Sequence, residues 1–84
     1  MEVIAKLRLI EWKNSASSKK EGDKYVDCIK HTLTFIPVAD NSPENKLFWE
    51  ATPSGKLELG MVNEEAVKGF EMLKEYYVTI RPAE

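Results

Sequence analysis

The residues best suited to chemistry in this chain are Cys28 and His31, its single cysteine and single histidine. Both fall in a segment rich in β-branched and aromatic residues, which predicts a strand. Residues three apart on a strand point to opposite faces, so these two side chains do not form a nucleophile–base pair. Two such ligands also fall short of a zinc site. We therefore interpret Cys28 as a small buried apolar residue and His31 as a hydrogen-bonded strand residue.

Two further motifs resemble functional sites but lack the residues that such sites require. The stretch "TPSGKL" has neither the first glycine of a phosphate-binding loop nor the hydroxyl residue that follows its lysine. Among the acidic residues no calcium-loop pattern occurs. The adjacent Glu64 and Glu65 are better explained as the first turn of a helix, where the positive helix end favours carboxylates. The sequence thus predicts no catalytic residue, no metal ligand and no cofactor, and hence a non-enzymatic protein.

Charge and cysteine content narrow the class of protein. The chain has 84 residues, with 12 basic and 14 acidic side chains and a formal net charge of −2. A chain so nearly balanced has no general attraction for nucleic acid or anionic membranes. One cysteine forms no internal disulfide, which is typical of a reducing compartment. The N-terminal segment has no apolar signal core, and no apolar run reaches the length of a membrane helix, so we expect neither secretion nor membrane insertion.

Strands dominate the expected structure, which is a single domain over residues 1–84. Alternating apolar side chains predict strands over residues 3–12, 25–38 and 56–62, and a last strand from residue 75 until Pro82 closes it. The 25–38 segment is long for one strand, so we expect a bend or bulge near its middle. Residues 13–24 hold no apolar side chain larger than alanine, which predicts a flexible loop within the domain.

Two segments predict helices. Ser42 and Pro43 resemble the N-cap and the first residue of a short helix over residues 43–51, and residues 52–55 after it fit a type I turn. Asn63 is the N-cap candidate of a longer helix. Because the links lack long crossover helices, we expect an α+β, mainly β fold: a small twisted antiparallel sheet or partly open barrel of about four to five strands.

Large aromatic side chains are the candidates for a protein interface. Trp and Tyr are enriched at binding hot spots, and a small domain gains stability by burying surface in an oligomer. The candidate residues are Trp12, Trp49, Tyr77 and Lys46, together with the 13–24 loop. For Trp49, a place in the core is an equally good interpretation, because the predicted elements do not fix the direction of its side chain.

A nucleic-acid-binding face is the alternative. Alternation puts Lys6, Arg8 and Trp12 on one face of the first strand, and Tyr77 and Arg81 on one face of the last. If these strands are neighbours, aromatic and basic side chains would meet on a surface of the kind that small barrels use for single-stranded nucleic acid. The net charge of −2 weighs against this alternative.

The C-terminal half of the chain resembles a group of small, mostly uncharacterised proteins of tailed bacteriophages. The shared pattern is an ENK-x-F segment, a TP-x-G turn, a helix ending in Phe, a KEYY strand and a terminal PAE. The matching residues here are Glu44, Asn45, Lys46, Phe48, Thr52, Pro53, Gly55, Phe70, Lys74, Glu75, Tyr76, Tyr77, Pro82, Ala83 and Glu84. Similar proteins have a Pro-Gly turn where this chain has "EMLK", which predicts a longer helix here. The resemblance implies a viral protein of the host cytoplasm or the virion, and no catalytic mechanism.

Together these observations predict a non-enzymatic phage protein that acts by protein–protein binding, as a self-associating assembly or virion-associated module and hence a homo-oligomer. The first alternative is a small-barrel protein that binds single-stranded nucleic acid. The second alternative is an inhibitor of a host defence protein. Both protein-binding hypotheses use the same candidate residues, whereas the nucleic-acid hypothesis uses the first and last strands.

Overall fold

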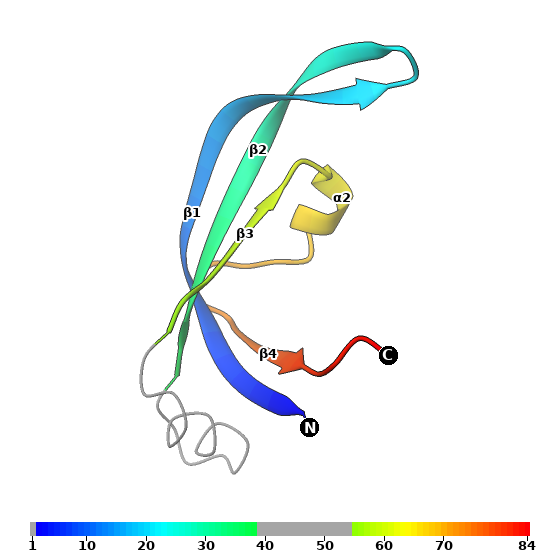
Figure 1. Cartoon of the computed structure of the whole chain (residues 1–84). Helices are drawn as coiled ribbons and strands as arrows, with labels where there is room; N and C mark the ends of the chain where they lie inside the picture. Colours follow the sequence, from blue (N-terminus) through cyan, green and yellow to red (C-terminus); the bar gives the residue numbers. More distant parts are fainter. Residues whose placement is uncertain (1, 39–54) are drawn as a thin grey trace.

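The computed structural model describes residues 2–38 and 55–84, which form a four-stranded antiparallel sheet (Figure 1). The strands are β1 (Val3–Glu21), β2 (Lys24–Pro37), β3 (Leu57–Met61) and β4 (Glu75–Ile80), and the short helix α2 (Glu64–Val67) lies between β3 and β4. The spatial order is β3-β2-β1-β4. Three successive strands lie side by side and the fourth returns to the first, which is a Greek key.

The core lies on one face of this sheet. Side chains that alternate along β1 and β2 are buried there; they are Ala5, Leu7, Leu9, Leu33 and Phe35. Because β3 and β4 are at opposite edges, the chain between them has to cross this face, as Figure 1 shows. Phe70 of that crossing segment packs against Phe35, with ring centroids 5.9 Å apart, and against Tyr76 at 5.3 Å. The crossing chain therefore closes the core without a second sheet.

The mainly β, antiparallel prediction is confirmed, while the longer helix is wrong. Asn63 does cap α2, because its side-chain oxygen accepts hydrogen bonds from the backbone N–H groups of Glu65 at 2.9 Å and Ala66 at 3.3 Å. The helix nevertheless ends at Val67. Gly69 follows shortly after, and glycine disfavours a helix by about 1 kcal/mol relative to alanine. Residues 68–69 form a turn instead, in which the N–H of Phe70 donates to the carbonyl of Val67 at 3.1 Å, and Phe70 packs against the core.

Among the described residues the sheet stays open, with β3 and β4 at its edges, and does not close into a barrel. The expected short helix at 43–51 and the turn at 52–55 lie outside those residues, except for Gly55. No helix in the described ranges has the length and apolar character needed to cross a membrane.

A β-bulge interrupts β1 at Ile10. Leu9 pairs with Phe35 and Glu11 pairs with Thr34, so Ile10 is an extra residue on β1. An extra residue bends the strand and increases its twist. The sequence placed a bulge in the middle of the 25–38 segment, but the register shift occurs between Leu9 and Glu11 of β1.

The bulge decides which way Trp12 points. Side chains alternate with period two, so one extra residue moves every later side chain to the opposite face. Trp12 is therefore opposite Leu33 and packs against the core, whereas alternation without a bulge placed it with Lys6 and Arg8. The prediction that these three residues share a face is wrong for that reason.

Beyond the four-stranded part, β1 and β2 continue as a two-stranded ribbon, here called the arm (residues 14–30), which is seen at the top of Figure 1. β4 pairs only with residues 3–8 and β3 only with residues 31–35. Gly22 opens the turn with φ of +63°, as a two-residue type II′ hairpin turn requires. Residues 13–21, expected to be a loop, are thus strand, because backbone pairing with β2 holds them extended regardless of their polar side chains.

Candidate interaction surfaces

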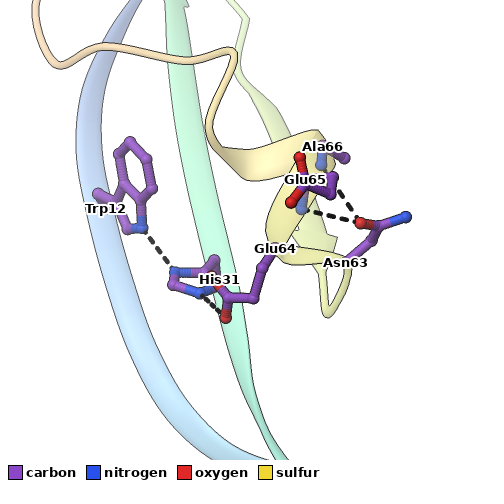
Figure 2. A network of polar contacts seen from close by, with 6 residues as sticks. All are labelled: Trp12, His31, Asn63, Glu64, Glu65 and Ala66. Atoms are coloured by element: carbon purple, nitrogen blue, oxygen red, sulfur yellow. Dashed lines mark hydrogen bonds and ion pairs between the residues drawn. The ribbon is translucent and has the colours of Figure 1, made fainter.

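Trp12, His31 and Glu64 form a hydrogen-bonded series that joins β1, β2 and α2 (Figure 2). The indole N–H of Trp12 donates to Nδ1 of His31 over 3.0 Å. On the other side of the ring, Nε2 of His31 lies 2.9 Å from Oε1 of Glu64. His31 is only 9% exposed, so these contacts replace most of its access to water. Through the contact between His31 of β2 and Glu64, the first residue of α2, this series holds the N-terminal end of α2 against the sheet.

The geometry fixes the tautomer of the neutral imidazole. An indole N–H can only donate, so Nδ1 of His31 has to accept, and the ring proton lies on Nε2 and is donated to the Glu64 carboxylate. Both ring nitrogens are then engaged. A general base needs a free lone pair within reach of the proton that it removes. The arrangement therefore agrees with the interpretation of His31 as a hydrogen-bonded strand residue.

The arm presents apolar side chains to solvent on the face that continues the core. Tyr25 is 73% exposed and Ile29 is 45% exposed. Ala16 pairs with Ile29 on the same face. Cys28 points to the other face and is half-buried, so it is less enclosed than the sequence suggested. α2 and the crossing chain cover the core in the four-stranded part of the sheet. Tyr25, Ile29 and Ala16, here called the apolar stripe of the arm, lie beyond that cover and are exposed.

On the other face of the sheet, the structure brings the first and last strands together. Lys6 pairs directly with Tyr77, and its Nζ lies 5.6 Å from the centre of the Tyr77 ring. Arg8 lies beside them and forms an ion pair with Glu75 at 3.0 Å. Arg81 follows the end of β4 and is exposed. The candidate nucleic-acid face thus retains Lys6, Arg8, Tyr77 and Arg81 on neighbouring strands, without Trp12.

Acidic side chains offset part of the positive charge on and beside this face. Arg8 is paired with Glu75, and further along β1 Lys13 lies 3.6 Å from Glu11. Exposed pairs of this kind contribute little stability, but they reduce the local positive potential that attracts phosphates. The charge distribution therefore weighs against a nucleic-acid surface here.

Sequence reasoning missed the partner of His31 and the exposed residues of the arm. Glu64 was assigned only to the first turn of a helix, and nothing in the local pattern connects it to a residue 33 positions earlier. The arm did have a local signal: Gly22 and Asp23 form a Gly-Asp pair between two extended segments, which is typical of a tight hairpin. The remaining interface candidates, Lys46 and Trp49, lie outside the described residues.

A comparison of the chain with protein-family models, curated proteins and solved structures finds no match in any of the three.

Proposed function

We propose that this chain is a non-enzymatic protein that acts by protein–protein binding and self-associates as an assembly module. Its resemblance to tailed-phage proteins implies that it is a phage protein of the virion or the host cytoplasm. The arm is the observation that carries this proposal. It extends past the four-stranded sheet, neither of its long edges has a neighbouring strand among the described residues, and it exposes Tyr25 and Ile29.

Energetics favour a partner for such an arm. An isolated two-stranded ribbon is marginally stable in water, and unpaired edges offer N–H and C=O groups to other chains. Fully burying one large apolar side chain contributes about 1.5–3 kcal/mol. Covering Tyr25 and Ile29 would therefore stabilise the arm substantially. The non-enzymatic part of the proposal draws on His31, whose two ring nitrogens are both engaged by Trp12 and Glu64.

Self-association of the whole chain is the first expected result. Sedimentation velocity across the micromolar range should show a weight-average mass that rises with protein concentration. The variant Ile29→Glu places a charge on the exposed apolar stripe of the arm and should weaken the association by about tenfold or more, as at an interface hot spot. Ile29 is not part of the buried core, so circular dichroism should show an unchanged fold.

Ser15→Glu is the matched control, because Ser15 is exposed on the opposite face of the same arm and should tolerate the charge. A chain that stays monomeric at every concentration would overturn the proposed self-association. If Ile29→Glu associates as well as the wild type, the arm is not the surface that carries it.

A further inference from the structure

The outer edge of β4 carries backbone groups without a partner strand in the part of the chain described by the structure. Two backbone hydrogen bonds of β1 show which residues direct their N–H and C=O groups to which neighbour. The N–H of Leu9 donates to the carbonyl of Lys74 at 3.1 Å, and the N–H of Val38 donates to the carbonyl of Lys6 at 2.9 Å. In an antiparallel sheet, successive residues bond to opposite neighbours. Odd-numbered residues of this part of β1 therefore bond to β4, and even-numbered ones bond to β2.

The same alternation assigns the groups of β4 itself. Tyr76 is opposite Leu7 and Val78 is opposite Ala5, so both direct their N–H and C=O groups to β1. Tyr77 and Thr79 consequently direct theirs to the free edge. Edge strands are usually protected by a charge, a proline or a bulge. The stretch "YYVTI", residues 76–80, has none of these and consists of strong strand formers.

We propose that this edge pairs with the same edge of a second copy, antiparallel, about a twofold axis at Val78. The proposal rests on the self-association proposed above and adds a second contact surface, separate from the arm. Val78 then faces Val78 of the second copy, Tyr77 faces Thr79, Tyr76 faces Ile80, and Glu75 faces Arg81. Two four-stranded sheets join into one continuous sheet, and the axis, perpendicular to it, keeps both covered faces on the same side.

Each opposed pair in this register is favourable. Tyr77 and Thr79 of the second copy exchange two backbone hydrogen bonds, because both direct those groups outward. Tyr76 and Ile80 form an aromatic–β-branched pair on the core face, a combination that stabilises antiparallel strands. On the other face, the ends of the strand carry opposite charges, Glu75 at one end and Arg81 at the other.

The charges select the register. An axis at Tyr77 would put Glu75 opposite Thr79, and an axis at Thr79 would put Glu75 opposite Ala83. With the axis at Val78, the Glu75 carboxylate, 3.0 Å from Arg8 of its own chain, also receives Arg81 of the second copy. One acid then lies between two bases at each end of the interface, so charge complementarity favours a second copy of this chain as the occupant.

Thr79→Pro tests the pairing with little effect on the monomer. Proline removes the Thr79 N–H, which points away from β1, so the bonds between β1 and β4 remain. By symmetry the dimer loses one backbone bond at each of two places, which should weaken it by about tenfold or more. Thr79→Val keeps the N–H and the branched side chain, and should dimerise like the wild type in sedimentation equilibrium. Equal dimerisation of Thr79→Pro and Thr79→Val would overturn the proposal.

Disulfide trapping tests the register independently of proline. In a Cys28→Ser background, Val78→Cys places two thiols directly opposite, with Cα atoms about 4.5 Å apart, within disulfide range. Tyr77→Cys and Thr79→Cys would each lie about 8 Å from their own copies, which is too far. We expect a covalent dimer under mild oxidation only for Val78→Cys.

The outcomes separate this inference from the proposed function. If the wild type associates but Val78→Cys gives no covalent dimer, the β4 pairing is overturned and self-association stands. A covalent dimer formed equally at residue 77 or 79 overturns the stated register. A wild-type chain that never associates overturns both. Ile29→Glu, altered in the arm, should still be trapped through Val78→Cys, because the arm and the β4 edge are separate surfaces.

Discussion

Phe35→Ala is expected to leave much of the protein unfolded at room temperature. Phe35 is 2% exposed and packs between Phe70 and Tyr76, with ring centroids 5.9 Å and 6.0 Å away. Phe-to-Ala changes in cores cost about 3–5 kcal/mol, and small domains have roughly that much stability in total. The change removes the side chain that holds the crossing segment onto the sheet. Urea unfolding followed by circular dichroism gives the difference in free energy of unfolding.

Ile36→Ala is the matched control for this experiment. Ile36 is the next residue on β2, points to the other face and is partly exposed. Its truncation should lower the free energy of unfolding by only about 1 kcal/mol. If both variants lose the same stability, Phe35 does not hold the crossing chain in the way that the structure indicates.

The second large effect is expected at the polar cluster. His31→Leu leaves the indole N–H of Trp12 partly buried without its acceptor, which should cost about 1–3 kcal/mol of stability. Trp12→Phe removes the donor instead and keeps an aromatic ring against Leu33. In the double variant no polar group of this pair remains unsatisfied, so its loss should be smaller than the sum of the two single losses.

A double-mutant cycle measured by urea unfolding checks this expectation. Glu64 is a useful third position, because its side chain is 60% exposed and water can replace the histidine. Glu64→Gln should therefore cost less than His31→Leu. Additive losses for the Trp12 and His31 variants would contradict the hydrogen bond between them.

Local patterns in the sequence were sufficient to predict the core face of β1 and the start of α2. The alternation of Val3, Ala5, Leu7 and Leu9 requires only that side chains alternate along a strand, and three of these four residues are in the buried core. Asn63 was identifiable as an N-cap because the preference arises from its own side chain and the next few N–H groups.

The features that the sequence did not reveal depend on contacts between distant segments. Residues 13–21 have no apolar alternation, yet pairing with β2 makes them strand. The position of Trp12 depends on one unpaired residue, which no local pattern marks. The Trp12, His31 and Glu64 cluster requires the bulge, the strand pairing and the return of α2 to the sheet. Propensity and periodicity describe neighbours in sequence, and these features involve neighbours in space.

The bulge at Ile10 also has a consequence for insertions and deletions in the gene. Loss of the Ile10 codon would leave Leu9 opposite Phe35 and Glu11 opposite Thr34 in a regular ladder, with every other side chain on its present face. Loss of the Lys13 codon would also give a regular ladder, but it would put Glu11 opposite Leu33 and Trp12 opposite Thr32, so that Glu11 instead of Trp12 would face the core. Chains of this fold can therefore differ by one residue in length at this position and share the same core.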